Sequence, residues 1–186
     1  MKLKYTILLI FLLNAISLHA ASDLATSSVL AAGKWYKLAA TSNGIYKVTG
    51  DFLSEKGVDL STVDPAKIRL FGNGAGMLPE LNSAIRQDDL REVAIKVYDG
   101  GDGKFDLTDY FIFYGESADK WVFEKQTRFF SHQKNLYSDT TYYFLNMDQQ
   151  AGRRVSFYPY QNLTPNHESA VYDIPLYHEL DSLNLI

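Results

Sequence analysis

The sequence predicts a mainly β, sandwich-like antiparallel domain with one short helix. Aromatic residues make up 14% of the 186 residues, and aromatic side chains favour strands and fill cores. Between positions 34 and 145, short apolar or alternating runs are separated by glycine, proline, asparagine and aspartate, which is the pattern of strands joined by turns. The run at 110–114 is aromatic or aliphatic at every position. Such a strand is expected at the centre of a sheet and covered on both faces, which favours a sandwich over a single open layer.

The first 20 residues are typical of a secretory signal peptide. Two lysines precede an apolar run at 7–13, and small residues follow it, in the order that export signals have. The apolar run is well below the roughly 20 residues that a spanning helix needs. We therefore expect an exported protein in the periplasm, at the outer membrane or on the cell surface, with no transmembrane helix in the mature chain. Residues 21–32 form a leader-proximal segment, and the β-rich module is expected over 33–186.

The module is expected to begin with two strands at 34–39 and 44–48. An Asn-Gly pair at 43–44 stands between them, and this pair is one of the strongest hairpin signals in a sequence. A β-hairpin is therefore predicted here.

One short helix is expected next, at 51–56. Thr49 precedes it, where a hydroxyl side chain caps the first turn, and Gly57 follows it, where a left-handed residue ends a helix. We expect Phe52 and Leu53 to lie against the sheet.

Further strands are expected after the helix. Asp64 and Pro65 form a turn before the first of them. Their ranges are 67–71, 92–98, 110–114 and 140–145, and one more strand could begin at 171–177, after a polar block at 153–169.

The composition excludes several classes of function. The net charge of −4 at pH 7 gives no electrostatic basis for binding nucleic acid. The sequence contains no cysteine, which excludes disulfides and a thiol nucleophile within these residues. The histidines at 132, 167 and 178 lack the spacing of a metal motif such as H-E-x-x-H, and no serine lies in a G-x-S-x-G context. We therefore assign no catalytic residue to this chain.

A glycine-rich loop at 72–77 has the spacing G-x-G-x-G after a predicted strand. Loops that bind phosphate need a helix to begin directly behind them. Here Pro79 follows with little helical pattern behind it, so a tight irregular loop is favoured over a nucleotide site.

An acidic loop at 99–109 is the one candidate metal site. Calcium binds several oxygen ligands from flexible acidic loops, but counting from Asp99 puts glycines at the third and fifth positions, where an EF-hand loop has ligands. The other interpretation is a long turn, since aspartate and glycine are the residues that turns prefer. No other cofactor is expected, and the ligands to test for calcium are Asp99, Asp102, Asp106 and Asp109.

Aromatic residues also allow a glycan-binding surface. Exported β-sandwiches bind sugars by stacking exposed aromatic rings on them, although alternating strand patterns favour a core role for most of these rings. The residues available for stacking are Trp35, Trp121, Tyr158 and Tyr160.

A series of short sequence motifs, taken in order, resembles one protein family. The chain is similar over 33–186 to the region ahead of the peptidase domain in the sortases of the Bacteroidetes type IX secretion system, which are gingipain-type cysteine peptidases. The motifs lie at 33–38, 43–48, 64–69, 72–79, 102–106, 110–115, 132–139 and 142–145.

The resemblance implies an enzyme that removes the C-terminal sorting domain from secreted cargo and joins the cargo to anionic lipopolysaccharide. That chemistry needs a cysteine nucleophile and a histidine base, and no residue of this chain matches either. The catalytic domain is therefore expected beyond Ile186, where the chain looks truncated. The implied partners are this downstream peptidase domain and other components of the secretion system.

Three functions remain open on the sequence alone. The first is a non-catalytic accessory module of such a sortase. The second is an independent exported glycan-binding module, which predicts an exposed cluster of aromatic residues. The third is a calcium-stabilised structural domain, which predicts that the acidic loop converges on one point.

Overall fold

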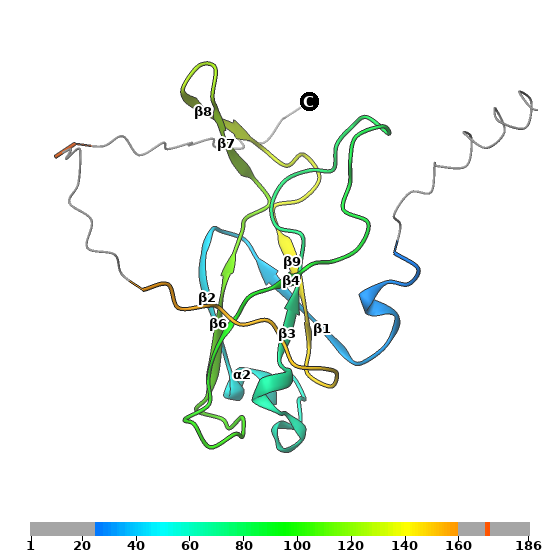
Figure 1. The fold of residues 1–186 in the computed structure, drawn as a ribbon, viewed down its shortest axis with the longest axis vertical. Helices are drawn as coiled ribbons and strands as arrows, with labels where there is room; N and C mark the ends of the chain where they lie inside the picture. The colour runs from blue at the N-terminus through cyan, green and yellow to red at the C-terminus, as the bar shows by residue number, and fades with distance from the viewer. Residues whose placement is uncertain (1–24, 160–169, 172–186) are drawn as a thin grey trace, which may run out of the picture.

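The computed structural model describes residues 25–159 and 170–171 (Figure 1). The leader at 1–20, Tyr160, His167, His178 and nearly all of the strand expected at 171–177 lie outside the described residues. No helix in the described part of the chain is long and apolar enough to cross a membrane.

Two antiparallel sheets form the body of the described structure. The four-stranded sheet has the order β1-β9-β3-β4, and the three-stranded sheet has the order β2-β6-β5. The strands of the first sheet are β1 (Trp35–Ala40), β9 (Thr141–Asn146), β3 (Arg69–Phe71) and β4 (Glu92–Val93). Those of the second are β2 (Gly44–Thr49), β6 (Tyr110–Gly115) and β5 (Lys96–Tyr98).

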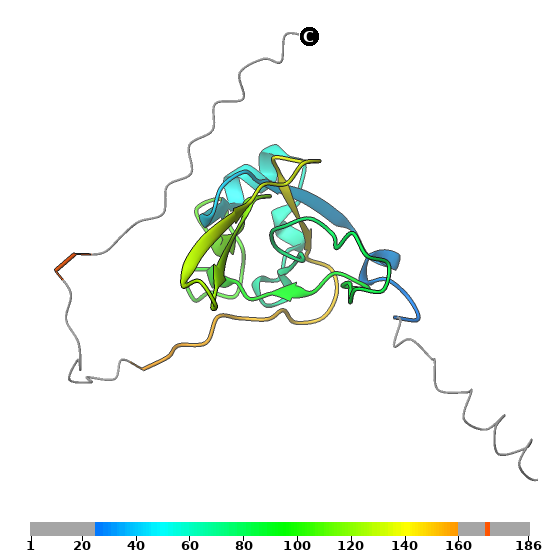
Figure 2. The same ribbon diagram turned by 90° about the horizontal axis from the view of Figure 1, so that it is seen from above.

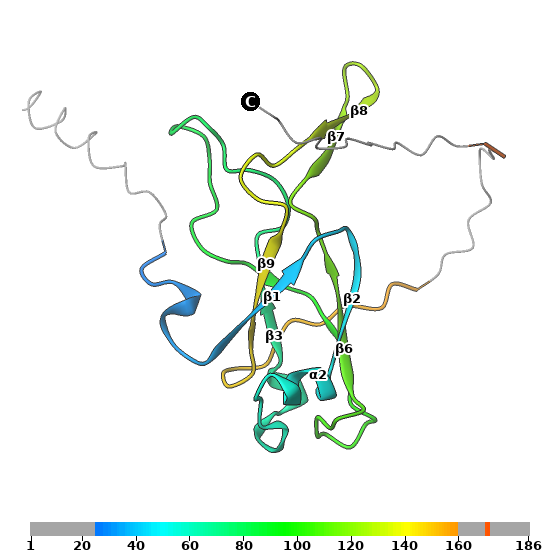
Figure 3. The same ribbon diagram turned by 180° about the vertical axis from the view of Figure 1, so that it is seen from behind.

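The remaining elements are short. The single α-helix among the described residues is α2 (Gly50–Glu55), and β7 (Lys120–Glu124) pairs with β8 (Phe129–Gln133) in a separate two-stranded sheet. This hairpin extends beyond the end of the two larger sheets (Figures 1 and 3). Three 3-10 helices are η1 (Val29–Ala31), η2 (Leu60–Thr62) and η3 (Pro65–Lys67).

The core lies between the two larger sheets, which occupy opposite sides of the molecule (Figures 1 and 2). Side chains alternate between the faces of a strand, so Phe111 and Phe113 of β6 face inward, as do Tyr143 and Leu145 of β9. The rings of Phe113 and Tyr143 meet across the interface with centroids 5.1 Å apart. The prediction of a mainly β, sandwich-like antiparallel domain with one short helix is confirmed.

The predicted hairpin at 43–44 is wrong, because β1 and β2 belong to different sheets. A type I′ turn needs positive φ at both central residues, and Gly44 does not have it. The chain instead turns a corner around Tyr46, whose hydroxyl accepts hydrogen bonds from the amides of Thr41 and Ser42, both at 3.1 Å, and donates to the Ser42 carbonyl. The corner passes the chain from one sheet to the other.

The predicted helix forms within one residue of its expected start and end. Thr49 Oγ1 accepts a hydrogen bond from the amide of Phe52 at 3.1 Å, and Gly57 adopts a φ of 82° behind the helix. Leu53 is buried as expected, but Phe52 is 40% exposed. The prediction for Phe52 is wrong because so short a helix directs only one of two adjacent side chains to the core.

The strand expected at 92–98 is two strands, one in each large sheet. It breaks at Ile95, which is fully buried between them. The strand at 110–114 is central in its sheet, as predicted, and Phe111 and Phe113 are buried. Among the described residues only its inner face is fully covered, since Tyr114 on the outer face is 54% exposed.

Candidate functional site

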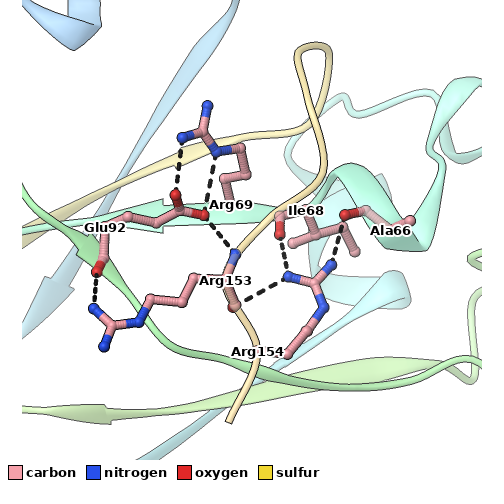
Figure 4. Close-up of polar contacts among 6 residues, drawn as sticks. All are labelled: Ala66, Ile68, Arg69, Glu92, Arg153 and Arg154. Carbon is pink, nitrogen blue, oxygen red and sulfur yellow. Dashed lines mark hydrogen bonds and ion pairs between the residues drawn. The ribbon is translucent and has the colours of Figure 1, made fainter. Parts of the chain in front are cut away.

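Residues 152–155 carry the chain away from the sandwich, and a group of arginine and carbonyl contacts fixes them there (Figure 4). We call residues 152–155 with these contacts the exit anchor. The Arg154 guanidinium donates hydrogen bonds to the carbonyl oxygens of Pro65 (2.7 Å), Ala66 (2.8 Å) and Ile68 (2.9 Å). Carbonyls at the end of a short helix lack most of their partners within it, so the arginine adds hydrogen bonds there to the one that the Ile68 amide gives the Pro65 carbonyl.

A glycine is required at the start of the exit anchor. The Gly152 amide donates to the Ala66 carbonyl at 2.9 Å. A Cβ atom on Gly152 would lie 2.3 Å from the carbonyl oxygen of Ile68, which is closer than atoms can pack. The absence of a side chain therefore lets the exit segment approach the η3–β3 turn.

Glu92 holds the exit anchor from the other side. Its carboxylate accepts hydrogen bonds from Arg69 Nε at 3.2 Å and from Arg69 Nη2 at 2.8 Å. It also accepts one from the amide of Arg153 at 2.6 Å. Burial raises the pKa of Glu92, but the hydrogen bonds from Arg69 and the Arg153 amide, with the charges of Arg69 and Arg154, outweigh burial and leave the pKa below its usual value. Glu92 thus compensates the charge of Arg69, which is only 8% exposed.

Backbone pairing completes the exit anchor. The Ile95 amide donates to the Arg153 carbonyl at 3.2 Å, and the Val155 amide donates to the Ile95 carbonyl at 3.0 Å. Ile95 and Arg154 form a parallel bridge. The group holds no nucleophile or acid–base pair, so its chemistry is that of a fixed attachment point for the chain that follows.

Burial lowers the pKa of the Arg154 guanidinium, against the charges of Glu92 and Asp64. An arginine remains protonated at neutral pH even so, and its charge is partly compensated by these two carboxylates. Sequence reasoning missed Arg69, Glu92 and Arg154. Their positions 23 to 85 residues apart give no local pattern, and only the fold brings them together.

The acidic loop holds three of its aspartate carboxylates in turn contacts, and Asp106 takes part through its backbone. Asp99 accepts the amide of Gly101 at 3.2 Å, Asp102 accepts that of Lys104 at 2.9 Å, and Asp109 accepts that of Asp106 at 2.7 Å. Among the described residues, no group of three or more histidine, aspartate or glutamate side chains is placed to hold a metal ion. The structure brings Asp106 and Asp109 together, and calcium binding by the loop stays a prediction.

The glycine-rich loop is irregular, as the sequence favoured. Gly74 and Gly76 have φ values of 77° and 100°, and no helix begins in the described residues directly behind them. The amide of Ala75 donates to the Glu116 carboxylate at 3.2 Å. A carboxylate of the protein itself therefore lies where a bound anion would have to be.

The four candidate aromatic residues have different surroundings. The ring of Trp35 packs edge-on against Phe71 with centroids 5.3 Å apart, and Trp121 packs against His132 at 4.8 Å. Tyr158 is 80% exposed, and Tyr160 lies outside the described residues. His132 also forms an ion pair with Asp119 at 3.5 Å when the imidazole is protonated.

No protein family and no curated protein matches this sequence significantly. The crystal structure of dimeric latent PorU from Porphyromonas gingivalis is similar, with a TM-score of 0.55 and 30% sequence identity. The match covers 74% of this chain and 12% of the PorU chain, so this chain spans only a small part of that protein's length. The greater part of this chain is therefore a PorU-like region.

Proposed function

We propose that this chain is the N-terminal accessory module of a type IX secretion sortase, a gingipain-like cysteine peptidase that removes C-terminal sorting domains from secreted cargo. The observation that carries the proposal is the likeness to PorU at 30% identity. The chain itself lacks cysteine, so the thiol chemistry belongs to a peptidase domain outside it. Export through the leader at 1–20 would bring the module to the periplasm, the outer membrane or the cell surface, where the other secretion components are.

The module's role in this proposal is to orient the peptidase domain. The exit anchor supports this role because Gly152, Arg153 and Arg154 are bonded on two sides. A chain that leaves a folded body in one fixed direction restricts the positions that the next domain can take. Restricted positions lower the entropy cost of a productive contact between the two domains.

Sequencing the gene beyond the codon for Ile186 tests the premise. The proposal expects an open frame that continues into a domain with a cysteine and a histidine in a gingipain-like setting. A stop codon directly after Ile186 would contradict it.

The orienting role is tested in the longer protein, with release of a sorting domain from reporter cargo as the measurement. Arg154→Ala is expected to slow release several-fold, because the exit segment then loses three carbonyl contacts. Arg91→Ala is the matched control, since Arg91 is an exposed arginine outside the exit anchor. Equal rates for the two variants would reject the orienting role and leave the family assignment intact.

A further inference from the structure

The outer face of the three-stranded sheet combines apolar, aromatic and cationic side chains. In the β2-β6-β5 register, Ile112 lies at the centre with Lys47 on one side and Lys96 on the other. We call this surface the lysine–tyrosine face. Its members are Ile45, Lys47, Lys96, Tyr98, Tyr110, Ile112 and Tyr114.

The two lysines of this face have aromatic rings rather than carboxylates as neighbours. Lys47 Nζ lies 4.0 Å from the centroid of the Tyr110 ring, and Lys96 Nζ lies 5.3 Å from that of Tyr98. Neither lysine is in an ion pair with a described residue. The protein carries a net charge of −4, so two cations without acidic partners on one sheet favour an acidic occupant.

Ring geometry leaves the ring of Tyr110 unavailable for stacking on a sugar. Tyr98 and Tyr110 stack with centroids 4.6 Å apart and planes inclined by 20°. Because β2 and β5 flank β6 on opposite sides, Lys47 and Tyr98 approach Tyr110 from opposite sides, and its ring has no free face for stacking. A polypeptide with carboxylate and apolar side chains fits this surface better.

The chain itself supplies such a polypeptide close by. Residues 153–155 run along Ile95, directly before edge strand β5, and Figure 1 shows the segment up to residue 159 crossing at the level of β6 and β2. The sequence from 156 to 186 contains no lysine or arginine. It contains many apolar residues and four carboxylates, which are Glu168, Asp173, Glu179 and Asp181.

The linking distance is sufficient. An extended chain covers about 3.3 Å per residue, so the ten residues from 158 to 168 reach roughly 30 Å. Three strands spaced by about 4.8 Å put the outer two only about 10 Å apart.

We propose that residues 168–181 of this chain fold back over the lysine–tyrosine face, with their carboxylates against Lys47 and Lys96 and their apolar side chains over Ile112. This contact would cover the outer face of β6, which the apolar residues of that strand predict to be buried. The proposal does not depend on the sortase assignment, since both surfaces belong to this chain.

Cysteine pairs in the full chain test the contact, because the natural sequence has no cysteine that would interfere. One variant joins Ile45→Cys to Leu176→Cys, and a control joins Phe129→Cys to Leu176→Cys. Ile45 is 67% exposed and Phe129 75% exposed, so the thiols are similarly accessible. With a short bismaleimide we expect the 45–176 link to form about ten-fold faster than the 129–176 link, because docking raises the effective concentration.

Charge reversal separates this contact from chance proximity. In the 45–176 background, Lys47→Glu with Lys96→Glu is expected to slow linking about five-fold, the loss expected for exposed ion pairs. Adding Glu179→Lys and Asp181→Lys is expected to restore the rate. The matched control is Lys34→Glu with Lys37→Glu, which removes two lysines that also lie over tyrosine rings, on the other sheet.

Three results would overturn the proposal. They are equal linking to positions 45 and 129, a rate that the reversal at Lys47 and Lys96 leaves unchanged, and links whose yield rises with protein concentration. The last result would assign the face to a second copy of the chain. Lys47→Glu with Lys96→Glu could slow linking simply by lowering the melting temperature. In that case the added Glu179→Lys and Asp181→Lys decide, and failure of these two substitutions to restore the linking rate counts against the contact.

Discussion

At the scale of single residues, the described structure depends on a few polar groups that have no signature in the sequence. Glu92 compensates a nearly buried arginine, and Gly152 allows two backbone segments to touch. Neither could be predicted from the chain, because a glutamate and a glycine are common in loops and only their surroundings make them sensitive. Thr49 and Gly57 were predictable for the opposite reason, since a helix cap and a helix end act on adjacent residues.

Glu92→Gln tests the charge compensation. The folded-state pKa of Glu92 lies below its ordinary value of 4.5. The ionised carboxyl therefore stabilises the folded protein above pH 4.5, and the stabilisation is lost as the pH falls through the folded-state pKa. We expect the substitution to cost about 1–3 kcal/mol at pH 7 and much less at acidic pH.

Urea denaturation of both proteins at neutral and at acidic pH measures this difference. Glu80→Gln, at an exposed position, serves as the control and is expected to change little. A cost at Glu92 that is the same at both pH values would show that the carboxyl acts by shape and not by charge.

Gly152→Ala tests the close approach in the exit anchor. The added methyl group would meet the Ile68 carbonyl at 2.3 Å, so a backbone shift is required, and we expect a loss of about 1–3 kcal/mol. Gly44→Ala is the control, since no atom lies within 4 Å of the added group there. Thermal denaturation distinguishes the two, and equal melting temperatures would contradict the steric argument.

At the scale of elements, strand and helix positions follow from local pattern, whereas strand pairing does not. The runs at 44–48, 110–114 and 140–145 form strands close to their expected limits. The Asn-Gly pair failed as a hairpin signal because the hydroxyl of Tyr46 and the Asn43 side chain, which accepts the Ser117 amide at 2.7 Å, shape a corner between sheets. Tertiary contacts outweighed the turn preference.

Tyr46→Phe tests this corner. Removal of the hydroxyl leaves two amides without their acceptor, and at this half-buried position we expect a loss of about 1 kcal/mol. Tyr114→Phe, on the half-exposed outer face of β6, should be close to neutral. Chemical denaturation gives both values, and a neutral Tyr46→Phe would mean that the backbone holds the corner without the hydroxyl.

The hairpin β7–β8 was not predicted, and its stability is expected to be local. A two-stranded ribbon is marginal in water by itself, and Phe129 and Phe130 are 75% and 55% exposed. Hydrogen exchange should therefore be much faster in Lys120–Glu124 and Phe129–Gln133 than in Thr141–Asn146, which is paired on both sides. Similar protection in the three strands would show that the hairpin is covered.

At the scale of the whole molecule, composition set the class of fold but not its site. Without cysteine the sheets depend on packing, and the core formed by β6 and β9 supplies it. The ordered sequence motifs predicted the likeness to PorU, because together they match the family at many positions. The exit anchor was beyond reach, since it joins three separated parts of the chain, at 65–69, 92–95 and 152–155.

The exit anchor also determines how the domain would bear mechanical force. Tension applied along the chain from residue 159 reaches residues 152–155 first and divides there between Ile95 and the turn at 65–68. Two attachments loaded together resist more than a strand whose bonds open one after another. A pull from a moving or unfolding neighbour would therefore stretch the polypeptide beyond Val155 before it could peel β9 from the sandwich.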